Sequence, residues 1–591
     1  MSYTLNLQNM KKEGVKSIAN KPKGPSVFGL LKPYRVMILF LLIFALASNG
    51  VNLFIPKIIS SAIDTFSSGH YDFGKIAIEF ILASLIIFLF TYLQSIIQTY
   101  SSERVARDLR NKMAEKISGQ SYQYIINANP SKLLTNLTSD IDSIKMFVSQ
   151  AVVTIASSIF MIVGTCTMLI LINWKLALAI IGIIPIIGGA FFIVLRKVRV
   201  LFKRSREVID WLNKVINESI MGAALIRVMN SQTLEYNKFL AANTDAKNLG
   251  LSILRLFSAL IPIITFVANL AMLTILALGG HFVVAGSMSL GDFAAFNSYL
   301  ALLIFPILMI GFMSNIIAQA SASYSRIYVV LEAKEPEDNG TITSELRGNI
   351  ELKNIQLYYG EKPILKDISF SVKAKSHTAI IGPTAAGKSQ LLYLLTNLVQ
   401  PDKGTIEYDG KLMADYDKES FHRQIGYVFQ DSAIFNMSLR ENIAFSEKVT
   451  DEMLNKAVET AELGDFIDSL PNKLETIISE RGTNLSGGQK QRIMLARALA
   501  LNPKILFLDD FTARVDRKTE LKILCNLENN YPDLTLVSVT QKISSVKHFE
   551  NIVLIMEGEL IASGTHKELI ESCPEYVQIY NSQKSTSHYE V

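Results

Sequence analysis

The chain has 591 residues, of which 49% are hydrophobic and only 19% are charged. A chain of this length exceeds what one hydrophobic core usually organises, so we expect several structural units. The positive mean hydropathy argues against a wholly soluble protein and predicts membrane-spanning segments. The net charge of +5 includes no compact basic tract, so nucleic acid is not an expected partner.

The N-terminal residues 1–26 are polar and rich in lysine, and they include Pro22 and Pro25. We expect them to form a loose cytosolic tail. No small-residue cleavage site follows the first apolar run, so a cleavable signal peptide is not predicted. The three cysteines of the chain lie far apart and lack the spacing of a disulfide framework or a zinc site.

Residues 27–324 hold six apolar stretches, each close to the length of about 20 residues with which a helix crosses a bilayer. The stretches are Val36–Ile59, Ile76–Thr99, Val148–Leu171, Leu176–Leu195, Phe257–Leu278 and Phe293–Met313. The links between the second and third stretches, and between the fourth and fifth, are long and basic. Because basic residues favour the cytoplasmic side, we predict that these links and both termini are cytoplasmic.

A change of composition marks the end of this membrane domain. Residues 325–348 are charged and rich in turn-forming residues, which is typical of a linker. Residues 349–580 alternate short β-type runs with helical runs, and residues 581–591 form a polar tail. The predicted fold is therefore an all-α six-helix transmembrane domain followed by a cytoplasmic α/β domain.

The segment from Gly382 to Ser389 has the G-x-x-x-x-G-K-S spacing of a phosphate-binding loop, between a predicted strand and a predicted helix. Such a loop directs backbone N–H groups and the positive end of a helix dipole at one point. Lys388 can then reach phosphates, and Ser389 can coordinate Mg²⁺. The predicted nucleotide-binding residues here are Gly382, Pro383, Thr384, Ala385, Ala386, Gly387, Lys388, Ser389 and Gln390.

Two further motifs follow the phosphate loop. Leu485–Gln489 reads L-S-G-G-Q, and the apolar run Ile505–Leu508 predicts a strand that ends in Asp509 and Asp510. In this order, the three motifs resemble those of the ATP-binding cassette (ABC) transporters, and the resemblance covers about residues 27–580. The six spans followed by one P-loop cassette look like a half-transporter of the exporter type, which works as a dimer.

The resemblance implies ATP and Mg²⁺ as cofactors, and it implies roles for individual residues. Tyr359 matches the aromatic residue that stacks on adenine, although the adjacent Tyr358 leaves this register open. Ser389, Gln430 and Asp509 match residues that meet Mg²⁺. The residues that match the signature, which closes over a nucleotide bound to the partner chain, are Ser486, Gly487, Gly488 and Gln489.

Two positions expected to be catalytic depart from the family pattern. Where the family usually has a glutamate as general base, this chain has Asp510, whose side chain is one methylene shorter. Gln541 stands where the family has a histidine that contacts the γ-phosphate. Outside these two positions, Phe511 and Arg514 replace a proline and a small residue in the turn after Asp510. Because general-base help is worth about 10²–10⁴-fold, these changes predict a site that binds ATP but hydrolyses it slowly. Neutral drift within an active enzyme is the alternative.

A weakened catalytic half with an intact signature resembles the degenerate-site subunit of a heterodimeric multidrug or lipid exporter. The resemblance therefore implies a partner half-transporter that keeps the glutamate and the histidine. A homodimeric lipid or peptide exporter remains an alternative within the family. An ATP-gated regulatory or channel-like membrane protein is the alternative from another functional class.

The predicted spans contain almost no ionisable residue, which favours hydrophobic or amphipathic cargo over inorganic ions. Their polar side chains are candidates either for a substrate cavity or for hydrogen bonds between helices. These polar residues are Asn49, Asn52, Gln94, Gln98, Thr165, Asn269 and Asn297. Segments near Gln123–Asn127 and Gly222–Ile226 resemble the coupling helices that seat on the cassettes. We expect an integral protein of a bacterial inner membrane.

Overall fold

The computed structural model describes residues 26–69, 73–336, 340–431 and 433–587, and it divides into two compact units. The first unit holds the chain up to Ser118 and again from Asn129 to Ala333. The second unit holds Gly119–Ala128 and the chain from Lys334 onward. The segment Gly119–Ala128 thus belongs with the cassette, although it lies within the range predicted as the membrane domain.

The first unit is helical. In the described chain, six helical segments are long and apolar enough to cross a membrane, and each contains one of the predicted spans. Its long helices are α2 (Arg35–Ser67), α3 (Phe73–Ser118), α7 (Val152–Ile172), α9 (Ile183–Met221), α11 (Gln232–Thr274) and α13 (Leu290–Leu331), and the short α8 (Trp174–Ile181) precedes α9. Its short helical elements are η1 (Gly29–Tyr34), α5 (Pro130–Thr135), η2 (Asn136–Asp140), α6 (Ile141–Met146), η3 (Phe147–Ala151), α10 (Ala223–Val228), η4 (Ile275–Gly279) and α12 (Gly280–Val284). The all-α prediction for this part of the chain is confirmed.

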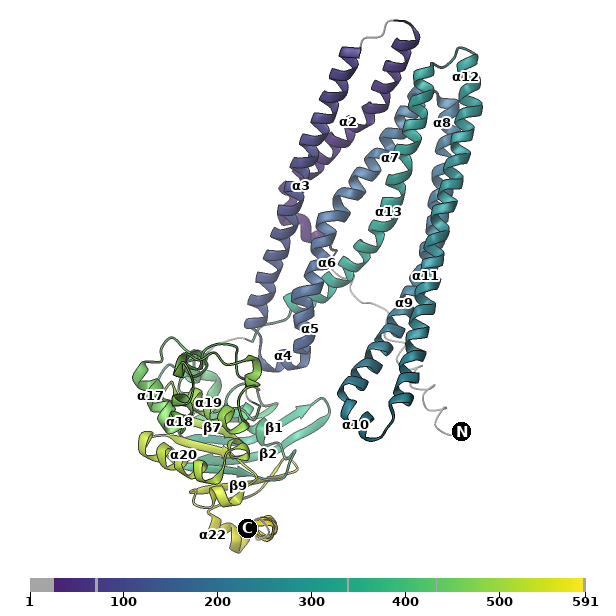
Figure 1. Ribbon diagram of the computed structural model, residues 1–591. Coiled ribbons are helices and arrows are strands. Elements are labelled where there is room, and N and C mark those ends of the chain that lie inside the picture. Colours follow the sequence, from purple (N-terminus) through teal and green to yellow (C-terminus); the bar gives the residue numbers. More distant parts are fainter. Residues whose placement is uncertain (1–25, 70–72, 337–339, 432, 588–591) are drawn as a thin grey trace. The chain divides into compact units, whose positions relative to one another are not determined.

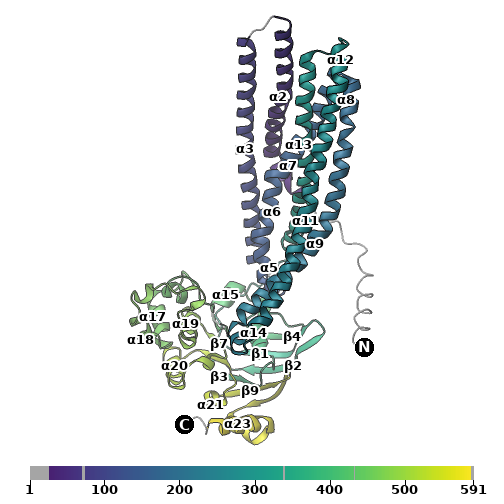
Figure 2. The same cartoon turned by 45° about the vertical axis from the view of Figure 1, so that its right-hand side comes forward.

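The helices of this unit pack in pairs. Helices α9 and α11 run side by side, and α13 packs against α7 and α2 (Figures 1 and 2). Two of the polar residues in the predicted spans join helices: the Asn49 amide donates a hydrogen bond to Ser157 Oγ over 3.1 Å, and the Gln98 amide donates to the Ser149 carbonyl. For these two residues, the contacts favour hydrogen bonds between helices over a substrate cavity.

Helix α13 continues past residue 324, the predicted end of the membrane domain, and runs to Leu331. The cause is a charge cluster at its end. Arg326 Nε donates a hydrogen bond to Asp140 over 2.9 Å, and Ser323 Oγ donates to the same carboxylate over 2.9 Å. These contacts hold the polar end of the helix against η2, so the predicted linker begins later than residue 325.

The second unit is an α/β domain, as the composition of residues 349–580 predicts. Its strands are β1 (Ile350–Tyr359), β2 (Lys362–Val372), β3 (His377–Ile381), β4 (Lys403–Tyr408), β5 (Lys411–Leu412), β6 (Ile425–Val428), β7 (Ile505–Asp509), β8 (Thr535–Val539), β9 (Asn551–Met556) and β10 (Glu559–Gly564). Its helices are α4 (Tyr122–Ala128), α14 (Lys388–Leu395), α15 (Lys418–Arg423), α16 (Leu439–Ile443), α17 (Asp451–Thr460), α18 (Gly464–Asp468), α19 (Gly487–Leu499), α20 (Arg517–Asn530), α21 (Ile543–Val546), α22 (His566–Ser572) and α23 (Pro574–Ser587). The 3₁₀ turns are η5 (Met413–Asp415), η6 (Lys473–Glu475), η7 (Glu480–Gly482) and η8 (Phe511–Arg514).

Two sheets organise this domain. An antiparallel sheet has the strand order β2-β1-β4-β5, and a larger sheet has the order β10-β9-β3-β8-β7-β6. Strands β7 and β8 are buried along their whole length, as expected for the centre of a largely parallel sheet covered on both faces. Helix α23 continues to Ser587, so the predicted polar tail from residue 581 begins as helix.

A polar contact joins α2 to the start of α13. Asp64 accepts hydrogen bonds from Ser289 Oγ over 2.7 Å and from the Gly291 N–H over 2.8 Å. Gly291 is pressed so closely against α2 that an added Cβ would lie 2.1 Å from the Ser60 carbonyl oxygen. Only glycine allows the two helices to approach to this distance.

The substitution Gly291→Ala is therefore expected to destabilise the first unit by about 1–3 kcal/mol, the usual cost of overpacking. The measurement is thermal unfolding of the full chain in detergent. Gly280→Ala in α12 is the matched control, because an added Cβ there meets open space. Equal melting temperatures for the two variants would contradict the close approach of α2 and α13.

Candidate functional site

The predicted site residues follow four neighbouring strands. Strands β3, β8, β7 and β6 are adjacent and parallel, so their carboxyl ends meet at one edge of the sheet. The register aligns these ends, because Ile380 pairs with Val539 and Val539 pairs with Asp509. Segments that are far apart in the sequence are thereby brought to one place.

The phosphate loop links β3 to α14 and needs its glycines for close approach. Gly382 has φ +152°, and an added Cβ would lie 2.0 Å from the Ile555 carbonyl oxygen. Gly387 has φ +95°, and its Cβ would lie 2.7 Å from the Leu365 side chain. Both positions therefore exclude larger residues. The loop then enters α14, whose first N–H groups remain available for an anion.

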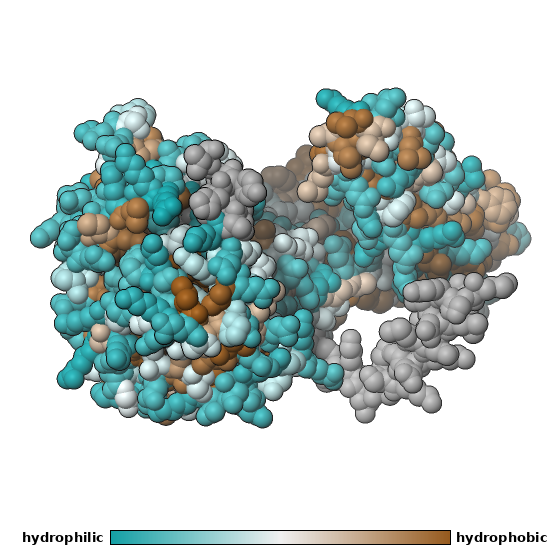
Figure 3. Space-filling model, turned by 90° about the horizontal axis from the view of Figure 1, so that it is seen from below, coloured by the Kyte–Doolittle hydropathy of each residue, from teal (hydrophilic) through white to brown (hydrophobic). Residues whose placement is uncertain are grey.

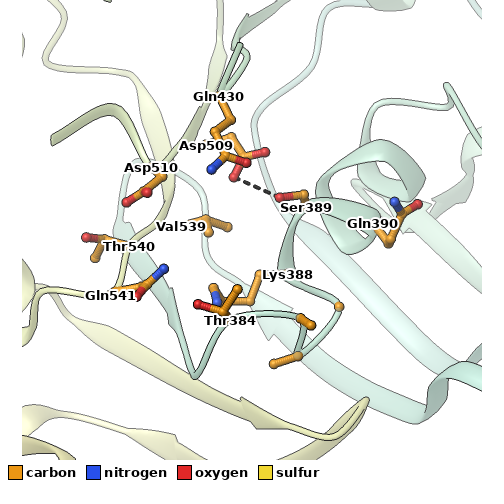
Figure 4. Close-up of a pocket in the computed structure, with 13 residues that line it drawn as sticks. Thr384, Lys388, Ser389, Gln390, Gln430, Asp509, Asp510, Val539, Thr540 and Gln541 are labelled. Atoms are coloured by element: carbon orange, nitrogen blue, oxygen red, sulfur yellow. Dashed lines mark hydrogen bonds between the residues drawn. The ribbon is translucent and has the colours of Figure 1, made fainter. Parts of the chain in front are cut away.

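Lys388 and Ser389 are the first two residues of α14, and their side chains contact different groups. Lys388 is 8% exposed, and its ammonium donates to the carbonyls of Gly382 over 2.9 Å and Pro383 over 2.7 Å. Ser389 Oγ donates to Asp509 Oδ1 over 3.1 Å, the contact drawn in Figure 4. The hydroxyl and the carboxylate that we expect to meet Mg²⁺ are thus in direct contact.

A cavity of about 130 Å³ lies at this edge of the sheet. It is lined by most of the predicted residues, namely Thr384, Ala385, Ala386, Gly387, Lys388, Ser389, Gln390, Gln430, Asp509, Asp510 and Gln541. Val539 and Thr540 also line it, and neither was predicted from the sequence. The signal for both was available, because Val539 ends β8 and Thr540 stands between this strand and Gln541. The signature residues Ser486–Gln489 do not line this cavity.

The two unusual residues lie together on one side of this cavity. Figure 4 shows Asp510, Thr540 and Gln541 along the side opposite Ser389. Asp510 is in the left-handed conformation, with φ +48°, and its N–H donates to the Val539 carbonyl over 2.9 Å. The Gln541 carbonyl accepts a hydrogen bond from Gln583 of α23 over 2.6 Å. The backbone of both residues is therefore held by neighbouring elements.

The contacts of Tyr358 and Tyr359 indicate which of the two is placed to stack on a nucleotide base. Tyr359 Oη donates to Gln390 Oε1 over 2.6 Å, which places the ring beside the helix that follows the phosphate loop. Tyr358 instead donates to Gln356 Oε1 over 3.2 Å, within its own strand. The geometry favours Tyr359 for contact with a base.

The electrostatics of the cavity suit a cation together with a phosphate anion. Burial lowers the pKa of the Lys388 ammonium, although Asp510 and Asp509 act against this shift. Burial also raises the pKa of the Asp509 carboxyl, against the hydrogen bond from Ser389. Each charge lacks enough compensation inside the protein, and a phosphate beside Lys388 and a cation beside Asp509 would supply it.

The donor set also fits Mg²⁺. The cavity offers the Ser389 hydroxyl, the Gln430 amide oxygen and the Asp509 carboxylate, all hard oxygen ligands. In the described ranges, no group of three or more His, Cys, Asp or Glu side chains could hold a metal ion. Mg²⁺ is usually held by one or two carboxylates together with water and the phosphates of a nucleotide, so the single carboxylate of Asp509 is a sufficient protein anchor.

The signature segment forms the start of α19. Ser486 caps this helix in a capping box: its Oγ accepts from the Gln489 N–H over 3.3 Å, and Gln489 Oε1 accepts from the Ser486 N–H over 2.8 Å. Gly487 and Gly488 pack against Arg514, where an added Cβ would lie 3.3 Å from its Cδ and 2.9 Å from its carbonyl oxygen respectively. The glycine pair therefore permits the turn after β7 to reach the signature.

Helix α4 packs on aromatic residues next to the cavity. The ring of Tyr122 lies 5.5 Å from that of Tyr393 on α14, and Tyr393 lies 6.5 Å from Phe429. Phe429 precedes Gln430, which lines the cavity. The helix that contains the segment Gln123–Asn127 thus packs within the second unit, close to Gln430.

Comparison with known proteins agrees with this architecture. Residues 38–307 match the family model of the ABC transporter transmembrane region, and residues 365–513 match the ABC transporter family model. An uncharacterised ABC transporter ATP-binding protein, YfiB of Bacillus subtilis, is 33% identical over 94% of this chain and 97% of its own length. A probable multidrug resistance ABC transporter protein of the same organism, YheI, is 28% identical over 94% of this chain and 96% of its own.

Two further similarities concern an exporter of lipid and a solved structure. The ATP-dependent lipid A-core flippase of Syntrophus aciditrophicus is 28% identical over 85% of each chain. The structure of a bacterial Atm1-family ABC exporter with ATP bound superposes with a TM-score of 0.78, at 23% identity, over 93% of this chain and 98% of that one. The latter similarity concerns the fold alone. The chain therefore belongs to the ABC exporters: it is a half-transporter, an integral membrane protein that uses ATP with Mg²⁺ to drive transport.

Proposed function

We propose that this chain is one subunit of an exporter of hydrophobic or amphipathic compounds, drugs or lipids, and that it pairs with a second half-transporter. ATP binding closes the two cassettes, and hydrolysis occurs mainly at the partner's site, which Ser486–Gln489 of this chain complete. The observation that carries the proposal is one pocket that combines an intact phosphate loop with Asp510 and Gln541.

The backbone of Asp510 supports slow hydrolysis at this chain's own site. Its N–H is bonded to Val539, so the Cα is held against β8 and cannot advance to make up for the missing methylene. The carboxylate then stays farther from the phosphate loop than a glutamate would. Gln541 adds a neutral amide where an imidazolium could carry charge. Both features weaken activation of a water without disturbing Lys388.

Exposed apolar side chains at the end of the α9–α11 hairpin support the proposal that this chain binds a partner chain. Met221 is 89% exposed and Val228 is 82% exposed, and Ile220 and Leu225 nearby are also exposed. Figure 3 shows hydrophobic side chains gathered at this end of the helical unit. Contiguous apolar surface of this kind marks an interaction site. Because Gly222–Ile226 resembles a coupling helix, we propose that it seats on a cassette.

The cargo class and the location rest on the relatives and on the spans. The relatives compared above include a lipid A-core flippase and a probable multidrug resistance protein, and both come from bacteria. The cargo of the present chain is accordingly proposed to be drug-like or lipid-like. We place the protein in a bacterial inner membrane, with the cassette and both termini in the cytoplasm.

The division of labour is tested in a complex of this chain with its partner half-transporter. Replacing the partner's catalytic glutamate by glutamine is expected to lower ATP turnover by about 10²-fold or more, because that site loses its general base. Asp510→Asn in this chain is expected to lower turnover by less than about twofold, since its site contributes little. Steady-state phosphate release measures both.

The double variant Asp510→Glu/Gln541→His serves as the gain-of-function arm. It restores both side chains, so a second competent site is expected to raise turnover toward about twofold. Two outcomes would contradict the proposal: loss of all hydrolysis on Asp510→Asn alone, or fast hydrolysis by a dimer of this chain without a partner. The second outcome would favour the homodimeric alternative.

The adenine contact is tested by Tyr359→Ala, with Tyr358→Ala as the matched control. Aromatic stacking on a base is worth about 1–3 kcal/mol, so Tyr359→Ala is expected to raise the Kd for ATP by about tenfold. The control is expected to change it less than about twofold, because Tyr358 contacts Gln356 within its own strand. Titration with a fluorescent ATP analogue measures the affinity. A larger loss in the control would assign the contact to Tyr358.

A further inference from the structure

The helical unit contains a second cavity, of about 440 Å³, lined by α9, α11 and α13. This volume falls within the range of about 300–1,000 Å³ found for small-molecule sites. Three of its lining residues are cations on α9, namely Arg199, Lys203 and Arg206. No aspartate or glutamate is among the lining residues. The cavity therefore has a cationic wall.

The spacing of the three cations places them on one face of α9. Positions 199, 203 and 206 are related by i, i+4 and i+7, so their side chains follow each other along the helix. Like charges at this spacing destabilise a helix unless an anion lies between them. Among the ion pairs that the structure describes, none involves these three residues, although Lys214 and Glu218 pair farther along α9.

Aromatic side chains complete the cavity. Phe202 lies between the cations on α9, and Phe257 faces it from α11. Ser314 and Asn315 on α13 add short polar groups. The cavity thus combines apolar surface, which binds an alkyl or aryl group, with cations and hydrogen-bonding groups, which bind a charged head.

The position of the cavity along the spans matches a ligand with two such ends. The fourth predicted span ends at Leu195, the fifth begins at Phe257 and the sixth ends at Met313, so the lining residues lie where these spans meet the cytoplasmic interface. At this depth, the apolar part of an amphiphile remains in the bilayer while its head reaches water. Cations here also suit anionic lipid heads.

We propose that this cavity binds an anionic amphiphile, with its phosphate, carboxylate or sulfonate head against Arg199, Lys203 and Arg206 and its apolar part against Phe202 and Phe257. The inference rests on the proposed function, because it specifies the charge of the exported compound. It concerns binding by this chain, and it does not depend on a partner or on the rate of hydrolysis.

Direct binding tests the proposal. The full chain is placed in phosphatidylcholine nanodiscs, and binding of radiolabelled dodecyl phosphate is measured without nucleotide. The triple variant Arg199→Gln/Lys203→Gln/Arg206→Gln is expected to bind at least tenfold more weakly. The matched control Arg196→Gln/Lys197→Gln/Arg204→Gln removes equal charge from the same helix, outside the cavity, and is expected to change affinity less than twofold.

Two further probes test the contributions of the anionic head and the alkyl tail separately. Dodecyltrimethylammonium has the same tail with the opposite charge and is expected to compete poorly. Inorganic phosphate has no tail and is also expected to compete poorly. Equal affinity for the cationic amphiphile, equal loss in the control variant, or no binding of dodecyl phosphate would each overturn the proposal. Should the triple variant fold poorly by gel filtration, Lys203→Glu alone must lower affinity at least tenfold.

A lipid competitor identifies the source of the ligand. If the bilayer supplies it, phosphatidylglycerol added to the nanodiscs is expected to displace dodecyl phosphate from the unmodified chain. If the cytosol supplies it, binding is expected to persist in these nanodiscs. Both results are compatible with an anionic amphiphile. Because no step measures ATP turnover, a negative result would leave the division of labour between the two cassettes unaffected.

Discussion

The alignment of four parallel strand ends is the constraint on which the nucleotide site depends. The hydrogen-bonded register sets Ile380, Val539 and Asp509 side by side, so the loops that follow them begin at the same level. A shift of one residue in this register would turn Asp509 from the cavity to the other face of the sheet. Strands β7 and β8 are buried along their whole length, so a slip would bring each side chain against the wrong packing layer and disturb the close packing on both faces of the sheet.

This edge of the sheet is also connected to the rest of the cassette. The Gln491 side chain on α19 donates to the Gln430 carbonyl over 3.3 Å, which joins the signature helix to the residue after β6. On the other side, α4 contacts Tyr393 and through it Phe429. The short segment Phe429–Gln430 therefore contacts the pocket and the signature helix directly, and it is linked to α4 through the ring of Tyr393.

Much of this architecture could be predicted from the sequence, because its signals are local. The length of each apolar stretch indicates a span, and the glycine and lysine spacing of the phosphate loop indicates its turn into α14. Boundaries were less accurate, since they depend on distant contacts. The end of α13 is held by Arg326 against Asp140, and a composition change at residue 325 cannot reveal such a pair. Helix α4 likewise belongs to the second unit, where Tyr122 contacts Tyr393, and the sequence alone does not reveal this distant contact.

The residues of the phosphate loop were predicted well, because their motif determines the backbone conformation. Residues whose role depends on which neighbour the side chain contacts were predicted less well. The choice between Tyr358 and Tyr359 required the contact with Gln390, and the contact of Arg514 with Gly487 required the turn after β7. The second cavity was also missed, because its cations appeared as a basic link. The three cations lie on one face of α9, and they line a cavity only because α11 and α13 pack beside that face.

Helix α23 has a consequence for how the far end of the chain influences the nucleotide pocket. Gln583 donates through its amide nitrogen to the Gln541 carbonyl and accepts through its oxygen from the Ile543 N–H over 3.0 Å. The side chain of Gln583 thus forms hydrogen bonds with the backbone of both Gln541 and Ile543, in the bend that follows β8. A displacement of α23 would remove both hydrogen bonds of Gln583 and thereby change the position of Gln541 in the pocket, without any contact with the nucleotide.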